Sequence, residues 1–325
     1  MKKKQMKWLS ILLVSVLGMT VLMTGCGSSG SGSGSAAPAE ETNGETAEET
    51  KEEAAVTEQT EEANTEAEAA EEVTVTLFAA KSLNTVMEDL IAQYQETHPG
   101  VKIVGSYDSS GTLMTQIQEG AACDVFFSAA QKQMDTLQDE GYVIEGTRHN
   151  VVNNQVVVVT YPDSGTQVTG LADLSKAANM ALADGSVPVG KYTRQALVNA
   201  GMIEAPADGS DVSEITTQQV ADAIGGLEIN ECGNVGAVAA AVSEGSNEVG
   251  TVYYSDTYGL EDQLVILETI SYDLTGNVIY PIGQIVNAEA SDAQAAAALE
   301  FVNYISSEEA KAVFQSYYFD TDVTD

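Results

Sequence analysis

Positive charge is scarce in this sequence, and the shortage excludes a large class of partners. The 325 residues include 13 Lys and Arg against 49 Asp and Glu, so the formal net charge is −36 at pH 7. Residues 73–325 hold eight Lys and Arg against thirty-five Asp and Glu, a difference of −27. Nucleic-acid binding needs a basic stripe that neutralises phosphates, so we expect no nucleic-acid partner. If the protein binds an anion, local hydrogen-bond donors must hold it.

Histidine and cysteine are also rare, which narrows the possible catalytic and metal sites. The only histidines are His98 and His149, and no Gly-x-Ser-x-Gly elbow, Walker loop or dinucleotide fingerprint is present. We therefore predict that the protein is not an enzyme and has no cofactor. A secreted hydrolase with a carboxylate pair remains an alternative, because carboxylates are abundant. Besides Cys26, only Cys123 and Cys232 occur, and we expect both to be thiols.

Long apolar runs are confined to the N-terminus. Four lysines in Met1–Lys7 precede the apolar run Trp8–Met23, which is typical of a secretory signal. The run ends in Leu22-Met23-Thr24-Gly25-Cys26, which resembles the signal of bacterial lipoproteins. This resemblance implies that residues 1–25 are a signal peptide and that Cys26 carries lipid. The protein would then be extracytoplasmic and held at the cell membrane by its lipid anchor only.

A polar tract separates this signal from the rest of the chain. Residues 26–72 begin with Gly and Ser repeats and continue with fourteen glutamates and one lysine between Glu40 and Glu72. So little apolar surface cannot offset the entropy lost on ordering the chain. We therefore expect a disordered tether whose charge serves spacing and solubility.

Two strand-to-helix junctions place hydroxyl groups where helices begin. Val73–Phe78 is predicted to be a strand, and an apolar stripe at helical spacing follows Ser82, which we expect to be an N-cap. The same order recurs at 108–113, where Asp-Ser-Ser-Gly-Thr precedes another helix. Hydroxyls, free N–H groups and the helix dipole together favour an anion at such a junction. For Ser82 alone, simple capping of its own helix is the alternative.

The rest of the pattern predicts an α/β protein with two lobes. Three strand-helix units in about seventy residues favour a parallel sheet with crossovers on both faces. Val156–Thr160 has no polar face, which predicts a strand buried on both sides. Asn234 is expected to cap a helix, and Ser306 to cap the second of two C-terminal helices. We expect the backbone to cross between the lobes more than once, with a cleft between them.

Adjacent tyrosines suggest a different ligand. Tyr253 and Tyr254 stand near carboxylates in the sequence, and paired tyrosines ligate ferric ion in some extracytoplasmic iron-binding proteins. Neighbouring side chains on a strand point to opposite faces, so one ring in the core and one exposed is the favoured interpretation. Ferric-iron transport therefore stays open as the second possible function.

A series of motifs runs in order between Val73 and Phe319. They are Phe78-Ala79-Ala80-Lys81-Ser82-Leu83, Ser109-Ser110-Gly111-Thr112-Leu113, Gly120-Ala121-Ala122-Cys123-Asp124-Val125-Phe126-Phe127-Ser128-Ala129 with Gln131-Lys132-Gln133-Met134-Asp135, Val187-Pro188-Val189-Gly190-Lys191-Tyr192, Gly250-Thr251-Val252-Tyr253, Tyr280-Pro281 and the closing segment 306–319. In this order they resemble the molybdate-binding component of bacterial ABC transporters. The combination is specific, whereas each motif alone is weak.

The resemblance implies a two-lobed type II periplasmic-binding fold, with a mainly parallel sheet flanked by helices in each lobe. Molybdate or tungstate would lie in the cleft between the lobes. Residues 73–152 would form the first lobe, 153–274 the second, and 275–325 would return to the first. The implied partner is the permease and ATPase complex of an ABC importer, and we expect the binding protein to be a monomer.

The implied site holds the oxyanion with neutral donors and does not ligate the molybdenum directly. From the first lobe, Ser82 and Ser110 would supply hydroxyls and helix-terminal amides. From the second, Val189 and Val235 would supply backbone N–H groups, and Tyr253 its phenol.

Lys81 departs from the family pattern, which has a small residue at this position. We expect Lys81 to pair on the surface with a neighbour such as Asp108. The alternative is a charge-assisted contact from its ammonium to the oxyanion.

Overall fold

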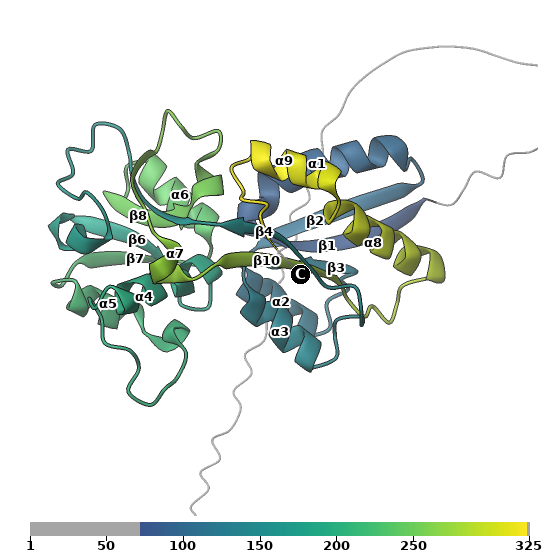
Figure 1. The fold of residues 1–325 in the computed structure, drawn as a ribbon, viewed down its shortest axis with the longest axis horizontal. Helices are drawn as coiled ribbons and strands as arrows, with labels where there is room; N and C mark the ends of the chain where they lie inside the picture. The colour runs from purple at the N-terminus through teal and green to yellow at the C-terminus, as the bar shows by residue number, and fades with distance from the viewer. Residues whose placement is uncertain (1–71, 324–325) are drawn as a thin grey trace, which may run out of the picture. The chain divides into compact units, whose positions relative to one another are not determined.

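The computed structural model describes residues 72–323. The predicted signal peptide (1–25), Cys26 and nearly all of the predicted tether (26–72) lie outside the described residues. In the described part, no helix is both long enough and apolar enough to cross a membrane. This part folds into two five-stranded sheets with helices packed against them (Figure 1).

The first sheet contains the N-terminal strands and one strand that returns late in the chain. Its strands, in spatial order, are β2 (Val101–Asp108), β1 (Val73–Ala80), β3 (Val125–Phe127), β10 (Val278–Gln284) and β4 (His149–Asn154). Strands β1 and β2 pair in parallel over their full length, and β3 is parallel to β1. Strand β10 is antiparallel to both β3 and β4.

The second sheet is built from the middle of the chain. Its strands, in spatial order, are β7 (Glu228–Cys232), β6 (Asn179–Ala183), β8 (Val249–Tyr253), β5 (Val156–Thr160) and β9 (Val265–Thr269). Strand β6 is parallel to β7 and β8, whereas β5 is antiparallel to β8 and β9. All five residues of β5 are buried, as its uniformly apolar sequence predicts.

The two-lobed α/β fold predicted from the sequence is confirmed, but its sheets are mixed, not mainly parallel. The backbone passes from β4 in the first sheet to β5 in the second, and returns from β9 to β10. In each sheet, the strand along which the chain enters and the strand along which it leaves run in opposite directions. The crossing strands therefore pair antiparallel with their neighbours. Each sheet consequently has two parallel and two antiparallel pairings.

Helices cover both faces of each sheet (Figure 1). In the first lobe, α1 (Asn84–Thr97), α8 (Asp292–Ile305) and α9 (Glu308–Ser316) lie on one face, and α2 (Ser110–Gln118) and α3 (Gln131–Asp139) on the other. In the second lobe, α6 (Val235–Ser243) lies opposite α4 (Pro188–Asn199) and α5 (Thr217–Ala223). The shorter helices are α7 (Tyr272–Thr275) and the 3₁₀ turns η1 (Lys81–Leu83), η2 (Leu171–Lys176), η3 (Val212–Glu214) and η4 (Tyr254–Thr257).

The helix starts agree only partly with the predicted caps. Asn234 caps α6 as predicted, since its side chain accepts a hydrogen bond from the N–H of Ala237. The prediction for Ser82 is wrong, because α1 begins only at Asn84, after a 3₁₀ turn that includes Ser82. The predicted cap of the last helix is wrong by one residue, because Ser307 and not Ser306 accepts from the helix N-terminus.

Candidate functional site

A small cavity lies between the two lobes, where several chain segments from both sheets meet. Its volume is about 10 Å³, close to what one water molecule requires. The residues that line it are Ala80, Lys81, Ser82, Ser109, Ser110, Ala129, Val187, Pro188, Val189, Val235 and Tyr253. The structure therefore brings all five sequence-predicted oxyanion-site residues to one place.

Three α-helices begin at this cavity. Ser110 is the first residue of α2, Val235 the first of α6, and Val189 the second of α4. The first N–H groups of a helix have no partner inside that helix. Among residues 72–323, the backbone N–H groups of these three residues have no backbone acceptor. Unpaired donors and the positive ends of three helix dipoles therefore meet at the cavity from both lobes.

The hydroxyl of Ser110 is oriented by a backbone contact. Its Oγ accepts a hydrogen bond of 2.9 Å from the N–H of Ala129, and the side chain is completely buried. Because a hydroxyl has one hydrogen to donate besides its lone pairs, this contact leaves the Ser110 proton available. The neighbouring Ser109 carries the cap of α2 instead, by accepting from the N–H of Thr112.

A chain of three polar groups leaves Ser82, like Ser110, with a proton to donate. The Oδ1 of Asn154 accepts from the N–H of Gln155, which turns the Nδ2 of Asn154 toward the phenol of Tyr280 at 3.2 Å. Since Tyr280 Oη accepts this bond, its own proton is available to Ser82 Oγ, 3.0 Å away. Ser82 can then accept from Tyr280 and donate into the cavity.

Tyr253 brings a hydroxyl that the protein itself does not satisfy. Its side chain is 1% exposed, and its Oη has no hydrogen-bond partner among the described residues. Buried polar groups nearly always have a partner, because an unsatisfied one costs about 1–3 kcal/mol. Burial raises the pKa of the Tyr253 phenol well above its ordinary value, so it stays protonated and can donate.

Buried Arg194 and a glycine fix the start of α4. A side chain at Gly190 would collide with the carbonyl oxygens of Ala183 and Asp184, so only glycine permits this close approach. The Nη1 of Arg194, which is fully buried, donates to the carbonyls of Ala183 and Gly190 at 2.9 Å. These contacts hold the segment that presents the N–H of Val189.

No carboxylate lines the small cavity within the described part of the chain. Asp108, the predicted partner of Lys81, accepts from Asn234 Nδ2 at 3.1 Å and from the N–H of Ser109 at 2.7 Å. The predicted Lys81–Asp108 ion pair is absent from residues 72–323, because Asp108 instead holds the two helix caps that flank the cavity. Asp256 lies behind Tyr253 and accepts its backbone N–H at 2.9 Å; burial raises the pKa of Asp256 to about 7.

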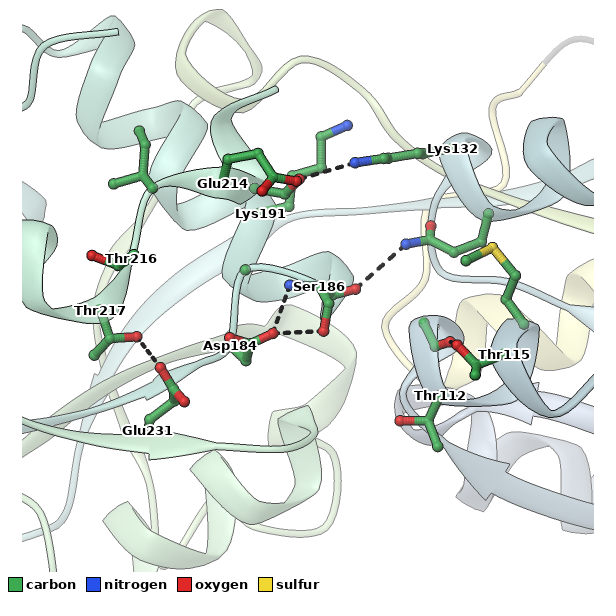
Figure 2. A pocket seen from close by; sticks show the side chains of 16 residues that line it. Thr112, Thr115, Lys132, Asp184, Ser186, Lys191, Glu214, Thr216, Thr217 and Glu231 are labelled. Carbon is green, nitrogen blue, oxygen red and sulfur yellow. Dashed lines mark hydrogen bonds between the residues drawn. The ribbon is translucent and has the colours of Figure 1, made fainter. Parts of the chain in front are cut away.

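A wider groove of about 580 Å³ opens between the lobes, and its lining includes Thr112 of α2 and Ser186, which lies just before α4 (Figure 2). Lys132 of the first lobe reaches across it, with its Nζ 2.9 Å from Ser213 Oγ and 3.5 Å from Asp211 Oδ1. Asp211 also pairs with Lys191 at 3.2 Å. Burial opposes the ionisation of Asp211, but hydrogen bonds from Ser213 and the charge of Lys191 outweigh it and hold the pKa well below its ordinary value.

The structure does not bring the tyrosines of the iron alternative together. Tyr253 is buried at the cavity, whereas Tyr254 is 38% exposed and its ring packs 5.3 Å from that of Tyr318. Within residues 72–323, no group of three or more His, Cys, Asp or Glu could hold a metal ion. Cys123 and Cys232 are both buried free thiols, as predicted.

One known protein family matches most of the chain. The family described as bacterial extracellular solute-binding protein matches residues 75–320. The chain belongs to this family. The resemblance predicted from the sequence motifs is thereby confirmed, and the family members compared below carry the names of transport proteins.

Three relatives of this solute-binding protein cover most of its length. "Putative ABC transporter substrate-binding lipoprotein YvgL" of Bacillus subtilis is 28% identical over 257 residues, which is 78% of this chain and 88% of that protein. Molybdate-binding protein ModA of Escherichia coli is 29% identical over 258 residues, 77% and 90% of the two chains. The solved substrate-binding domain of a "putative molybdenum ABC transporter" from Clostridium difficile is 29% identical, with a TM-score of 0.55, and covers 77% and 100%.

Sequence reasoning missed the residues that support the site of this solute-binding protein. Tyr280 belongs to a sequence motif, but its contact with Ser82 and the role of Asn154 have no local sequence signal. An arginine in the apolar stripe of α4 is a local signal that could have indicated the buried role of Arg194. Nothing in the local sequence indicates that Lys132 contacts Asp211, because the two residues are distant in the chain and meet only through the fold.

Proposed function

We propose that this protein captures molybdate or tungstate outside the cytoplasmic membrane and delivers it to an ABC importer. The observation that carries the proposal is the buried phenol of Tyr253, which has a proton to donate and no acceptor among the described residues. It lines a cavity where Ser82, Ser110, Val189 and Val235 also offer donors. A fully deprotonated oxyanion is the ligand class that supplies only acceptors.

The charge of the ligand explains why the donors are neutral. Dipoles and hydroxyls stabilise an anion without leaving unpaired charges buried when the ligand departs. Local donors act at contact distance, whereas most of the repulsion from distant carboxylates is screened within a Debye length of about 8 Å. A net charge of −27 on residues 73–325 is therefore compatible with an anion as cargo.

The donor set also discriminates against protonated oxyanions such as phosphate. Phosphate at neutral pH carries at least one O–H, which needs an acceptor to replace its bond to water. With no carboxylate among the lining residues, the site lacks a strong acceptor for that O–H, so phosphate should bind poorly. Molybdate and tungstate carry no proton at this pH and have the same tetrahedral shape.

The proposed transport role includes an anchor and moving lobes. Lipid on Cys26 would hold the protein at the membrane, near the permease and ATPase complex that receives the anion. Residues 73–152 with 275–325, and residues 153–274, would close on the ligand as two bodies, and a monomer suffices for this. The molybdenum would be bound only through its oxygens, and no chemical change of the ligand is required.

A thermal-shift panel of the purified protein tests this function. Molybdate and tungstate at 1,000 times Kd should stabilise the fold by about 4 kcal/mol, a rise in Tm of about 10 °C. Phosphate and ferric citrate should leave Tm unchanged, and bound molybdate should be released unaltered on denaturation. A shift with ferric citrate but none with molybdate would favour the iron function instead.

A further inference from the structure

Lys81 is the only cationic residue among those that line the small cavity in the described part of the chain. The side chain is partly buried, and its ammonium has no ion pair or hydrogen bond within residues 72–323. Asp108, a possible partner from the sequence, is engaged with Ser109 and Asn234. An ammonium without a protein partner in that part of the chain, next to a set of neutral donors, is free to interact with a bound anion.

The stem of Lys81 crosses from the first lobe to the second. A Cβ at Gly236 would lie 3.0 Å from Lys81 Cε and 3.1 Å from Lys81 Cγ, so the stem packs directly over this glycine. Gly236 follows Val235 at the N-terminus of α6, where the second lobe supplies its N–H donors. Lys81 also lines a neighbouring cavity of about 340 Å³.

We propose that Lys81 is a specificity-determining residue of the oxyanion site, where its ammonium selects for a doubly charged anion. This inference rests on the proposed function and deepens it. The neutral donors recognise the tetrahedral shape of the oxyanion and hydrogen-bond to its oxygens. Lys81 adds a full positive charge whose attraction is proportional to the charge of the ligand. The glycine at 236 leaves room for the Lys81 stem to extend along the start of α6, beside the donors of the second lobe.

The proportionality gives a quantitative signature. If removal of the lysine charge weakens the binding of a dianion about tenfold, it should weaken the binding of a monoanion of the same shape only about threefold. Molybdate and perrhenate are such a pair, because both are tetrahedral tetraoxoanions and their charges are −2 and −1. The ratio of their Kd values therefore isolates charge from shape.

The test is calorimetric titration of the whole protein with molybdate and with perrhenate. Lys81→Met keeps an apolar stem and removes the charge, and it should reduce the preference for molybdate about threefold or more. Lys81→Arg should retain most of the preference, since it restores the charge. Gly236→Ala, which displaces the stem, should shift the ratio in the same direction as Lys81→Met. Lys102→Met is the matched control, because Lys102 is exposed on β2, and it should change neither Kd.

Two results would overturn the inference in distinguishable ways. If wild-type protein binds molybdate but Lys81→Met weakens both anions equally or neither, then Lys81 serves packing alone and the proposed function stands. If wild-type protein binds neither anion, the proposed function fails and the inference fails with it. Should Lys81→Met melt at a much lower temperature than wild type, Lys81→Gln supplies the same comparison with a polar terminus.

Discussion

The phenol of Tyr280 lies 3.0 Å from the hydroxyl of Ser82, although the two residues are 198 positions apart in the chain. Asn154 donates to the same phenol, which keeps the phenol proton available and favours a direction that runs from Asn154 through Tyr280 to Ser82. This direction leaves the Ser82 proton for a ligand. Tyr280 thus positions a donor without lining the cavity itself.

Tyr280→Phe should weaken molybdate binding about three- to tenfold, because Ser82 keeps its hydroxyl but loses the bond that orients it. Ser82→Ala removes the donor itself and should cost about ten- to a hundredfold, since a hydrogen bond to a charged group contributes roughly 1.5–3 kcal/mol. Calorimetric titration measures both. An equal or larger loss in Tyr280→Phe would contradict the assigned direction of the bonds.

Ser110→Ala should differ from Ser82→Ala in its effect on stability. Both variants should lose molybdate affinity to a similar degree. Ser110→Ala also leaves the buried N–H of Ala129 without its acceptor, so its free energy of unfolding should fall by about 1–3 kcal/mol. Urea denaturation of the ligand-free proteins checks this difference. Unchanged molybdate affinity in both serine variants would remove these two residues from the site.

Lys132 should affect how long the ligand stays. Its contacts with Asp211 and Ser213 join the two lobes, so Lys132→Met should raise the rate of molybdate dissociation several-fold with little change in Tm. High salt should raise the wild-type dissociation rate and have little effect on the variant. Stopped-flow measurement of ligand release gives both rates. Lys311→Met is the control, since Lys311 pairs within α9 only.

Asp256 should make stability depend on pH. The folded-state pKa of about 7 lies above the ordinary value of 3.8, because burial disfavours the carboxylate. The neutral carboxyl therefore contributes its full stabilisation below about pH 4. The free energy of unfolding then falls by at most about 4 kcal/mol as the pH rises through about 7. Asp256→Asn remains neutral and can still accept the Tyr253 N–H. Urea denaturation from pH 5 to 8 should show that the stability of the variant increases relative to that of wild type as the pH rises. If both proteins show the same dependence of stability on pH, the raised pKa of Asp256 is contradicted.

The parts of the fold that sequence predicted best are those with local causes. The cap at Asn234 depends on a contact three residues away, and the burial of β5 depends on an unbroken run of apolar side chains. The candidate site could be assembled from motifs because each of its donors stands at or near a strand-to-helix junction. These signals are contained within a few neighbouring residues.

The errors arise where distant residues decide the outcome. Ser82 was predicted to cap a helix, but its hydroxyl contacts Tyr280 and a 3₁₀ turn delays the start of α1 to Asn84. Lys81 was expected to pair with Asp108, which instead contacts Asn234 from the other lobe. No local pattern encodes such contacts, because they depend on how the two lobes meet.

The most direct test of the central claim is Tyr253→Phe, which removes one oxygen atom and little else. The phenol has no hydrogen-bond partner among the described residues of the ligand-free protein, so the variant should melt at an equal or higher temperature without molybdate. Its affinity for molybdate should nevertheless fall about ten- to a hundredfold in calorimetric titration. Unchanged affinity, or a ligand-free protein that melts markedly lower, would contradict the account.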